Sequence, residues 1–168
     1  MDIPTIDTPH LTLRAWAPRD ADVWHDILQE EAILRYFPNP DPPSRPKADE
    51  YIAHHLEHWR AFGYGHWAIV TPDDAQVIGW CGLEYLPELQ QTELAYLLSK
   101  RAWGRGYATE AARAALDFGF GRAGLTTIIG LVHPANTGSI RVLEKCGLTF
   151  SDQLTLWGLA MLRYRRQV

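Results

Sequence analysis

In some segments of this chain of 168 residues, apolar residues alternate with polar ones, as in a β-strand. In others they recur at helical spacing, and the changes between the two patterns mark the predicted strands and helices. Positions 11–14 alternate between apolar and polar residues, which predicts a half-buried strand. Apolar residues then recur at helical spacing after Pro18 and Asp20, and again across 46–62. The proline-rich stretch 38–43 separates these two predicted helices.

The rest of the chain reads mainly as strands. We expect strands at 67–70, 77–83, 92–99 and 127–132, and two short strands near 148–152 and 155–163. Residues 72–74 supply a turn, so the first two of these strands should form a hairpin. A helix from about Arg105 to Phe120 connects the strands 92–99 and 127–132. A helical crossover of this length is right-handed and joins parallel strands, so the pattern predicts an α+β protein with a mixed sheet.

Composition narrows the class of protein. The hydrophobic content of 46% and the length suit one domain with a substantial core, over residues 1–168. Two cysteines cannot build a disulfide framework, and neither has zinc-ligand spacing. The formal charge of −4 argues against direct binding of nucleic acid. We find no apolar run of membrane-spanning length and no targeting signal, and therefore expect a cytoplasmic protein with no membrane partner and no metal.

The segment Arg101-Ala102-Trp103-Gly104-Arg105-Gly106 carries the strongest chemical signal. It lies between a predicted strand and an alanine-rich helical pattern. Glycines there let the backbone turn tightly, and a helix N-terminus presents free N–H groups and a partial positive charge. We expect backbone groups from Gly104 through Gly106, Tyr107 and Ala108 to Thr109 to bind a phosphate group, and Arg101 and Arg105 to add positive charge.

A second motif follows about thirty residues later, Asn136-Thr137-Gly138-Ser139 running to Glu144-Lys145-Cys146-Gly147. Together the two motifs resemble the GNAT superfamily of acyl-CoA-dependent N-acetyltransferases, whose pyrophosphate loop reads (Gln/Arg)-x-x-Gly-x-(Gly/Ala). The second motif and the opening Thr8-Pro9-His10-Leu11-Thr12-Leu13-Arg14 are similar to the RimJ/RimL-like branch, which acetylates ribosomal-protein N-termini. The resemblance extends from about Thr8 to Phe150. It implies the GNAT fold, a largely antiparallel twisted sheet with a splayed central parallel pair and about four helices.

The resemblance implies acetyl-CoA as co-substrate, with its pantetheine arm lying in the splay. Backbone groups of Leu97, Leu98 and Ser99 would bind that arm and polarise the thioester carbonyl, since strand-edge N–H groups can stabilise an oxyanion. Asn136 would cap the following helix and bind a pantetheine amide.

Glu93 falls where several members of the superfamily carry a catalytic glutamate, and could accept the amine proton. A charged residue on the solvent face of a strand is the equal alternative. Many members use a tyrosine as the acid, but this chain has Leu143 at that position. Ser139 is the replacement that the RimL-like branch implies, although its hydroxyl could instead bond the helix start. For Glu110, in the first turn of the phosphate helix, we expect a structural role.

The resemblance predicts direct attack of a primary amine on acetyl-CoA, with a protein N-terminal amine as acceptor. A polyamine, amino acid or aminoglycoside is the alternative acceptor, and a non-catalytic acyl-CoA sensor is the alternative function. The acceptor groove should lie between region 30–62 and the last strands, lined by Tyr36, Phe37, Tyr85 and Trp157. His54, His55 and His58 lie in one predicted helix, and His54 and His58, four residues apart, could bind a metal. They lack a third ligand of suitable spacing, so we expect a solvated helix surface. A homodimer is expected from the superfamily.

Overall fold

The computed structural model describes residues 2–168, and an eight-stranded sheet runs through them in the order β1-β2-β3-β4-β5-β6-β8-β7. The strands are β1 (Ile6–Asp7), β2 (Thr12–Arg14), β3 (His66–Thr71), β4 (Asp74–Leu86), β5 (Gln91–Leu98), β6 (Thr127–Val132), β7 (Thr149–Leu156) and β8 (Leu159–Gln167). The helices are α1 (Ala21–Leu28), α2 (Arg45–Phe62), α3 (Tyr107–Gly121) and α4 (Thr137–Lys145). The expected α+β architecture with a mixed sheet is confirmed.

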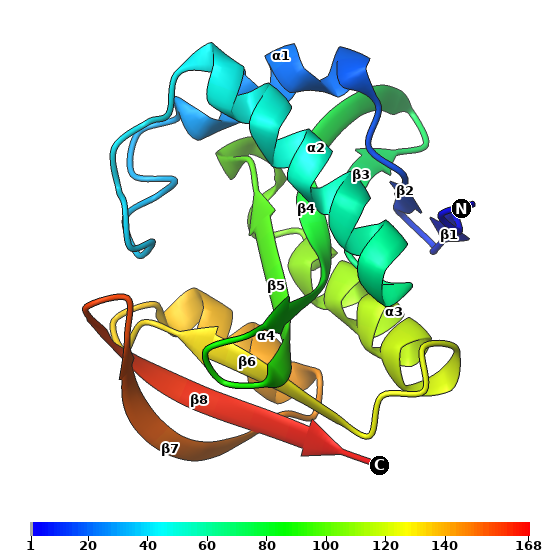
Figure 1. The fold of residues 1–168 in the computed structure, drawn as a ribbon. Coiled ribbons are helices and arrows are strands. Elements are labelled where there is room, and N and C mark those ends of the chain that lie inside the picture. The colour runs from blue at the N-terminus through cyan, green and yellow to red at the C-terminus, as the bar shows by residue number, and fades with distance from the viewer. Residues whose placement is uncertain (1) are drawn as a thin grey trace.

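The sheet divides where β5 meets β6. These two strands are parallel and joined through α3, as the crossover predicted, whereas the other neighbouring strands are antiparallel. Within the described residues, Glu93 and Ile129 are the one registered pair between β5 and β6. Beyond this pair the two strands diverge, which leaves the C-terminal half of β5 and the end of β6 facing a gap (Figure 1).

Helices cover both faces of the first half of the sheet. Strand alternation divides β3, so that Ala68 and Val70 pack with α1 while Trp67 and Ile69 pack with α3. Figure 1 shows α1 and α2 on one side of β3–β5 and α3 on the other, with α4 beside β6. Each face of the sheet therefore packs against its own buried cluster of apolar side chains, which holds the strands between them in place. No helix in residues 2–168 is long and apolar enough to cross a membrane.

Two turns with positive φ explain why some observed helix and strand boundaries differ from those predicted from the sequence. Helix α3 begins at Tyr107 rather than Arg105, because Gly104 and Gly106 adopt φ values of 72° and 81° that no helix contains. The last hairpin turns at Trp157 and Gly158, both with positive φ, so β7 is longer than predicted and β8 starts later. Strand β1 was not predicted, because two residues carry too little pattern.

The expected solvated histidine surface on α2 is wrong for two of its three histidines. His55 and His58 are 3% and 7% exposed, and only His54 lies on the surface. The His58 Nδ1 donates to the Tyr64 carbonyl oxygen at 2.9 Å, and its Nε2 accepts from the Tyr85 N–H at 3.0 Å. The face of α2 that looked polar in sequence thus packs against the sheet through neutral imidazoles.

Candidate active site

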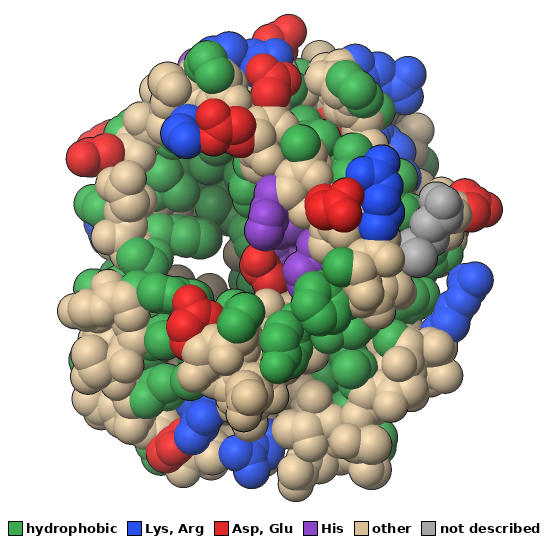
Figure 2. All heavy atoms as spheres, viewed as in Figure 1, with side chains coloured by type: hydrophobic (Ala, Val, Ile, Leu, Met, Phe, Trp, Pro, Cys, Tyr) green, Lys and Arg blue, Asp and Glu red, His purple; other side chains and the backbone are tan. Residues whose placement is uncertain are grey.

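Two cavities meet where β5 and β6 diverge. The first has a volume of about 520 Å³ and the second about 680 Å³. Residues shared by the two linings are Tyr36, Phe37, Tyr96, Asn136 and Ser139. Viewed from the side of α2, the molecule is hollowed between its N-terminal half and the β6–β8 half, and the visible wall of the hollow is largely hydrophobic (Figure 2). A ligand could therefore cross the gap between the strands from one cavity into the other.

The two cavities carry opposite charges. The first, which we call the acidic cavity, is lined by the carboxyl groups of Glu84 and Glu93 and by no lysine or arginine of the described chain. The second, the basic cavity, has no described aspartate or glutamate in its lining, and its charged residues are Arg35, Lys100, Arg141 and Lys145. Anions are favoured on one side of the gap and cations on the other.

The start of α3 forms one end of the basic cavity. Its N-cap is Gly106, which has no side chain to satisfy the first-turn N–H groups. Gly104, Gly106, Tyr107, Ala108 and Thr109 all line this cavity. A 15-residue helix with an uncapped N-terminus directed into a cavity suits a phosphate group, because its free N–H groups and its dipole both favour an anion.

Of the predicted cofactor-binding residues near the start of α3, some line the basic cavity and others lie outside it. Leu97 and Leu98 line the basic cavity. Ser99 is 2% exposed, its N–H donates to the Ile78 carbonyl oxygen at 2.8 Å, and its hydroxyl donates to Glu30 at 2.5 Å. The structure thus places Ser99 in the bonding that anchors the loop rather than in the cavity lining. Arg101 and Arg105 lie on the surface and are likewise absent from this lining.

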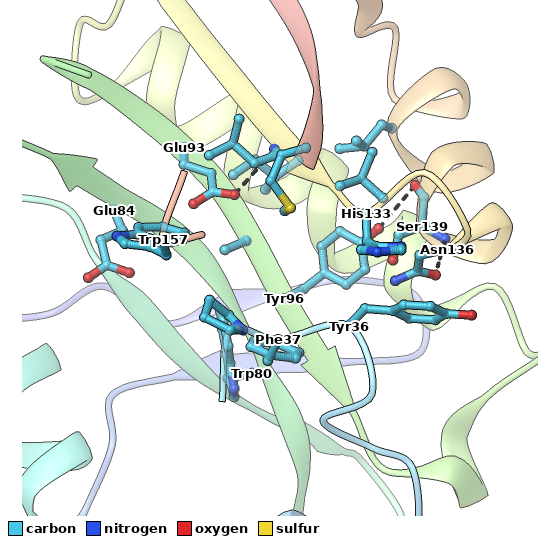
Figure 3. Close-up of a pocket in the computed structure, with 17 residues that line it drawn as sticks. Tyr36, Phe37, Trp80, Glu84, Glu93, Tyr96, His133, Asn136, Ser139 and Trp157 are labelled. Carbon is cyan, nitrogen blue, oxygen red and sulfur yellow. Dashed lines mark hydrogen bonds between the residues drawn. The ribbon is translucent and has the colours of Figure 1, made fainter. Parts of the chain in front are cut away.

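Helix α4 contributes the opposite wall. The Asn136 side chain caps it, with Oδ1 accepting from the Ser139 N–H at 3.2 Å. The Tyr96 hydroxyl reaches across from β5 and donates to the Ser139 carbonyl oxygen at 3.3 Å. Asn136, Ser139 and Tyr96 therefore meet at the junction of the two cavities (Figure 3). Tyr96 was missed in the sequence because a tyrosine in a β-strand is ordinary there.

Glu93 bridges the diverging strands. Its Oε1 accepts from the Leu131 N–H of β6 at 3.2 Å (Figure 3). Burial raises the pKa of Glu93 from its usual 4.5 to about 8, and the nearby Glu84 adds to the rise while the Leu131 N–H opposes it. A carboxyl with a pKa near neutrality, at the edge of a cavity, can exchange a proton with a ligand there.

Glu84 lies directly opposite Glu93 on the neighbouring strand, and both side chains therefore point to the same face. Its two oxygens approach the Nε2 atoms of His54 and His66, at 3.4 Å and 3.6 Å. Sequence reasoning did not single out Glu84. The alternation that places Trp80, Gly82 and Glu84 on one face was visible, but its register against Glu93 was not.

Of the four predicted acceptor-groove residues, Tyr36, Phe37 and Trp157 line the acidic cavity. Tyr36 stacks on His133 with ring centroids 5.2 Å apart, and its hydroxyl donates to the Ala135 carbonyl oxygen at 3.3 Å. Tyr85 is not among the lining residues. It follows Glu84 on β4, points to the other side, and stacks on Phe62 at 5.2 Å. Strand alternation separates it from the cavity that Glu84 faces.

Two other sequence expectations concerned structural residues. The Glu110 carboxylate accepts from the Thr8 hydroxyl at 2.7 Å and from the His10 N–H at 2.8 Å, so it anchors the N-terminal segment to α3. Cys81 and Cys146 are buried free thiols, and burial raises the pKa of both. A raised pKa keeps a thiol protonated near neutral pH, which disfavours a nucleophilic role for either cysteine.

Comparison with known proteins identifies the family. The model of the acetyltransferase (GNAT) domain family matches residues 10–149, and the chain belongs to this family. It is 38% identical to the uncharacterized N-acetyltransferase YnaD of Bacillus subtilis (strain 168) over 144 residues, 85% of this chain and 81% of the relative. An acetyltransferase from Agrobacterium tumefaciens str. C58 superposes with a TM-score of 0.86 at 32% identity, covering 100% of this chain and 96% of the other.

The same fold occurs in RimL, a ribosomal L7/L12 alpha-N-protein acetyltransferase solved with coenzyme A. Its TM-score is 0.84 at 15% identity, with 98% of each chain covered. At that identity the likeness concerns the fold alone. The family and the named relatives make this protein an N-acetyltransferase.

Proposed function

We propose that this N-acetyltransferase binds acetyl-CoA in the basic cavity and passes the acetyl group to a primary amine held in the acidic cavity. The division of charge across the gap between β5 and β6 carries the proposal. CoA is a polyanion, whereas an amine acceptor is a cation before it reacts. Each substrate meets the opposite charge on its own side, and the reacting atoms meet at the junction.

Acetyl-CoA would be held mainly by backbone. The N–H groups at the start of α3, from Gly106 to Thr109, bind the pyrophosphate, and Gly104 supplies the turn. The edge of β5 at Leu97 and Leu98, left without a partner strand, receives the pantetheine arm, and Asn136 bonds one of its amides. Arg101 and Arg105 act through their charge from the surface, and Ser99 acts by fixing the loop.

The reaction is a direct attack in a ternary complex. Glu93 takes a proton from the acceptor ammonium, directly or through water, and the neutral nitrogen attacks the thioester carbon. The N–C bond forms, the attached nitrogen gives its second proton to solvent, and the C–S bond breaks as the tetrahedral intermediate collapses to the amide. The Ser139 hydroxyl gives its proton to the departing thiolate and recovers one from solvent. Strand-edge N–H groups of β5 stabilise the oxyanion.

Two acceptor classes fit the acidic cavity. The RimJ/RimL-like motifs of the sequence favour a protein N-terminal amine. A small amine is the second candidate, because the cavity carries two carboxylates beside one another. Tyr36, Phe37 and Trp157 would contact either acceptor. A single domain over 1–168, a cytoplasmic location and a homodimer stay predictions of the sequence.

The test is release of CoA thiol from acetyl-CoA across a panel of amines. The panel contains peptides with free Ala, Ser or Leu N-termini, amino acids, polyamines and an aminoglycoside. We expect release above the hydrolysis rate with one class. Peptide turnover alone would favour the N-terminal acceptor. Acetyl-CoA binding without release on any amine would refute the proposed reaction.

A further inference from the structure

The acidic cavity holds one carboxylate more than the proposed reaction uses. Glu93 is in place to take the proton of the attacking amine, but Glu84 lies opposite it and lines the same cavity. Side chains of directly opposed strand residues lie about 5 Å apart at their Cβ atoms. The proposed proton transfer needs only Glu93, so Glu84 is a second acidic group in the cavity to which that reaction gives no role.

No basic side chain of the described cavity lining neutralises Glu84. The imidazole nearest to its Oε2 belongs to His66, which is 1% exposed. Burial holds the pKa of His66 well below its usual value, so that this ring is neutral near pH 7. The 3.6 Å between the His66 Nε2 and Glu84 is too long for a hydrogen bond, and that Nε2 has no partner. His54 stands 3.4 Å from the other oxygen, on the solvent side, with its side chain 63% exposed.

The walls beside Glu84 suit an organic cation. Trp80 lies on the same face of β4 as Glu84, with Gly82 between them, and lines the cavity together with Phe37 and Trp157. Figure 3 shows Glu84, Trp80, Phe37 and Trp157 among the residues that line this cavity. Aromatic faces attract ammonium groups and bind alkyl chains, and a carboxylate next to them supplies the opposite charge. A hydrated metal ion would gain nothing from such walls.

We propose that Glu84 and the surrounding tryptophans form a second subsite, which binds a distant ammonium group of the acceptor while the reacting amine faces Glu93. The acceptor is then an aliphatic molecule with two or more amines. This inference rests on the proposed function and selects among its acceptor classes. It makes Glu84 a specificity-determining residue, because an acceptor with a single amine leaves that carboxylate with no partner beyond the exposed His54.

The test compares acceptors that differ only in the second amine. Putrescine is matched with butylamine, and cadaverine with pentylamine, in initial-rate assays of thiol release by the full-length protein. Because a hydrogen bond to a charged group is worth about 1.5–3 kcal/mol, kcat/KM should favour each diamine by at least about tenfold. The preference should shrink as salt is added, since ions screen the attraction.

Glu84→Gln keeps the size of the side chain and removes its charge. We expect the diamine preference to fall to about twofold or less in this variant, mainly through a higher KM for the diamine. Glu57→Gln is the matched control, because Glu57 lies on α2 at the surface, outside the cavity, and pairs with Arg60. That control should keep the wild-type preference.

The outcomes separate this inference from the proposed function. Turnover of peptides or monoamines at rates equal to those of the diamines would overturn the inference and leave the reaction intact. A preference that survives in Glu84→Gln would also overturn it. If Glu84→Gln fails to fold, as judged by circular dichroism, the wild-type preference and its salt dependence decide the matter. No turnover of any amine would remove the proposed function, and this inference with it.

Discussion

Replacing Glu93 with glutamine tests the chemistry most directly. Glutamine is nearly the same size as glutamate, and its side-chain carbonyl oxygen could still accept the Leu131 N–H that the Glu93 carboxylate accepts now. The variant therefore removes the acid–base function with little change to the link between β5 and β6. A positioned general base contributes about 10²- to 10⁴-fold to a rate, and we expect kcat to fall within that range.

The pH dependence of kcat/KM carries the sharper prediction. With the pKa of Glu93 at about 8, roughly a tenth of the molecules hold the ionised base at pH 7 and roughly nine tenths at pH 9. A peptide α-amine, whose pKa is about 7.7–8.0, titrates in the same window. Because the reactive pair is ionised Glu93 and the protonated amine, the wild-type logarithmic plot should rise with a slope of one below pH 7 and fall with a slope of one above pH 9. The variant depends on amine that is already neutral, so its plot should rise with a slope of one and then stay level.

The pH dependence of the free energy of unfolding is an independent measure of the raised pKa of Glu93. Between pH 4.5 and about 8 the folded protein holds a proton on Glu93 that the unfolded chain has released. The contribution of Glu93 to stability therefore falls as pH rises through this window, by up to about 5 kcal/mol, at about 1.36 kcal/mol per pH unit. The buried histidines His55, His58 and His66 have lowered pKa values and act in the opposite direction below about pH 6.5, in the wild type and the variant alike. In urea unfolding at pH 5 and pH 8.5, the wild type should therefore lose stability relative to Glu93→Gln. Rate plots of the same shape together with equal changes in stability in both proteins would falsify the base assignment.

Four further substitutions have separate readouts. Gly106→Glu should abolish acetyl-CoA binding in calorimetry, because it places a negative charge at the α3 N-terminus and strains a residue whose φ is 81°; retained binding would contradict the phosphate site. Ser139→Ala should lower kcat more than it raises the acetyl-CoA KM, since protonation of the leaving thiolate belongs to the transition state; the opposite split would return Ser139 to a structural role. Trp157→Ala should raise the acceptor KM about tenfold, because this residue lines only the acidic cavity, and a loss of CoA affinity instead would show that it is misplaced. Asn136→Ala should lower the free energy of unfolding by about 1 kcal/mol through loss of the α4 cap, and chemical denaturation with no shift of the midpoint would argue against that cap.

Local sequence signals were sufficient for most of the fold. The residues of β6 were predicted to the position, and the parallel pairing of β5 with β6 followed from the length of the connecting helix. The Gly104 and Gly106 turn, the Asn136 cap and the Pro72–Asp73 hairpin turn are short-range chemistry, and so they are readable from neighbouring residues. The last hairpin was misplaced because Trp157 adopts a positive φ that tryptophan rarely takes.

Motifs a few residues long were enough to predict the family from the sequence alone, and they also supplied the proposed phosphate-binding loop and acid–base residues. Tertiary structure alone decided which of them share a cavity. Strand register sets Glu84 beside Glu93 and turns Tyr85 away. The single pairing of Glu93 with Ile129 opens the gap between β5 and β6, and burial there raises the pKa of Glu93 to about 8. These properties come from contacts between residues far apart in the chain, which local pattern does not encode.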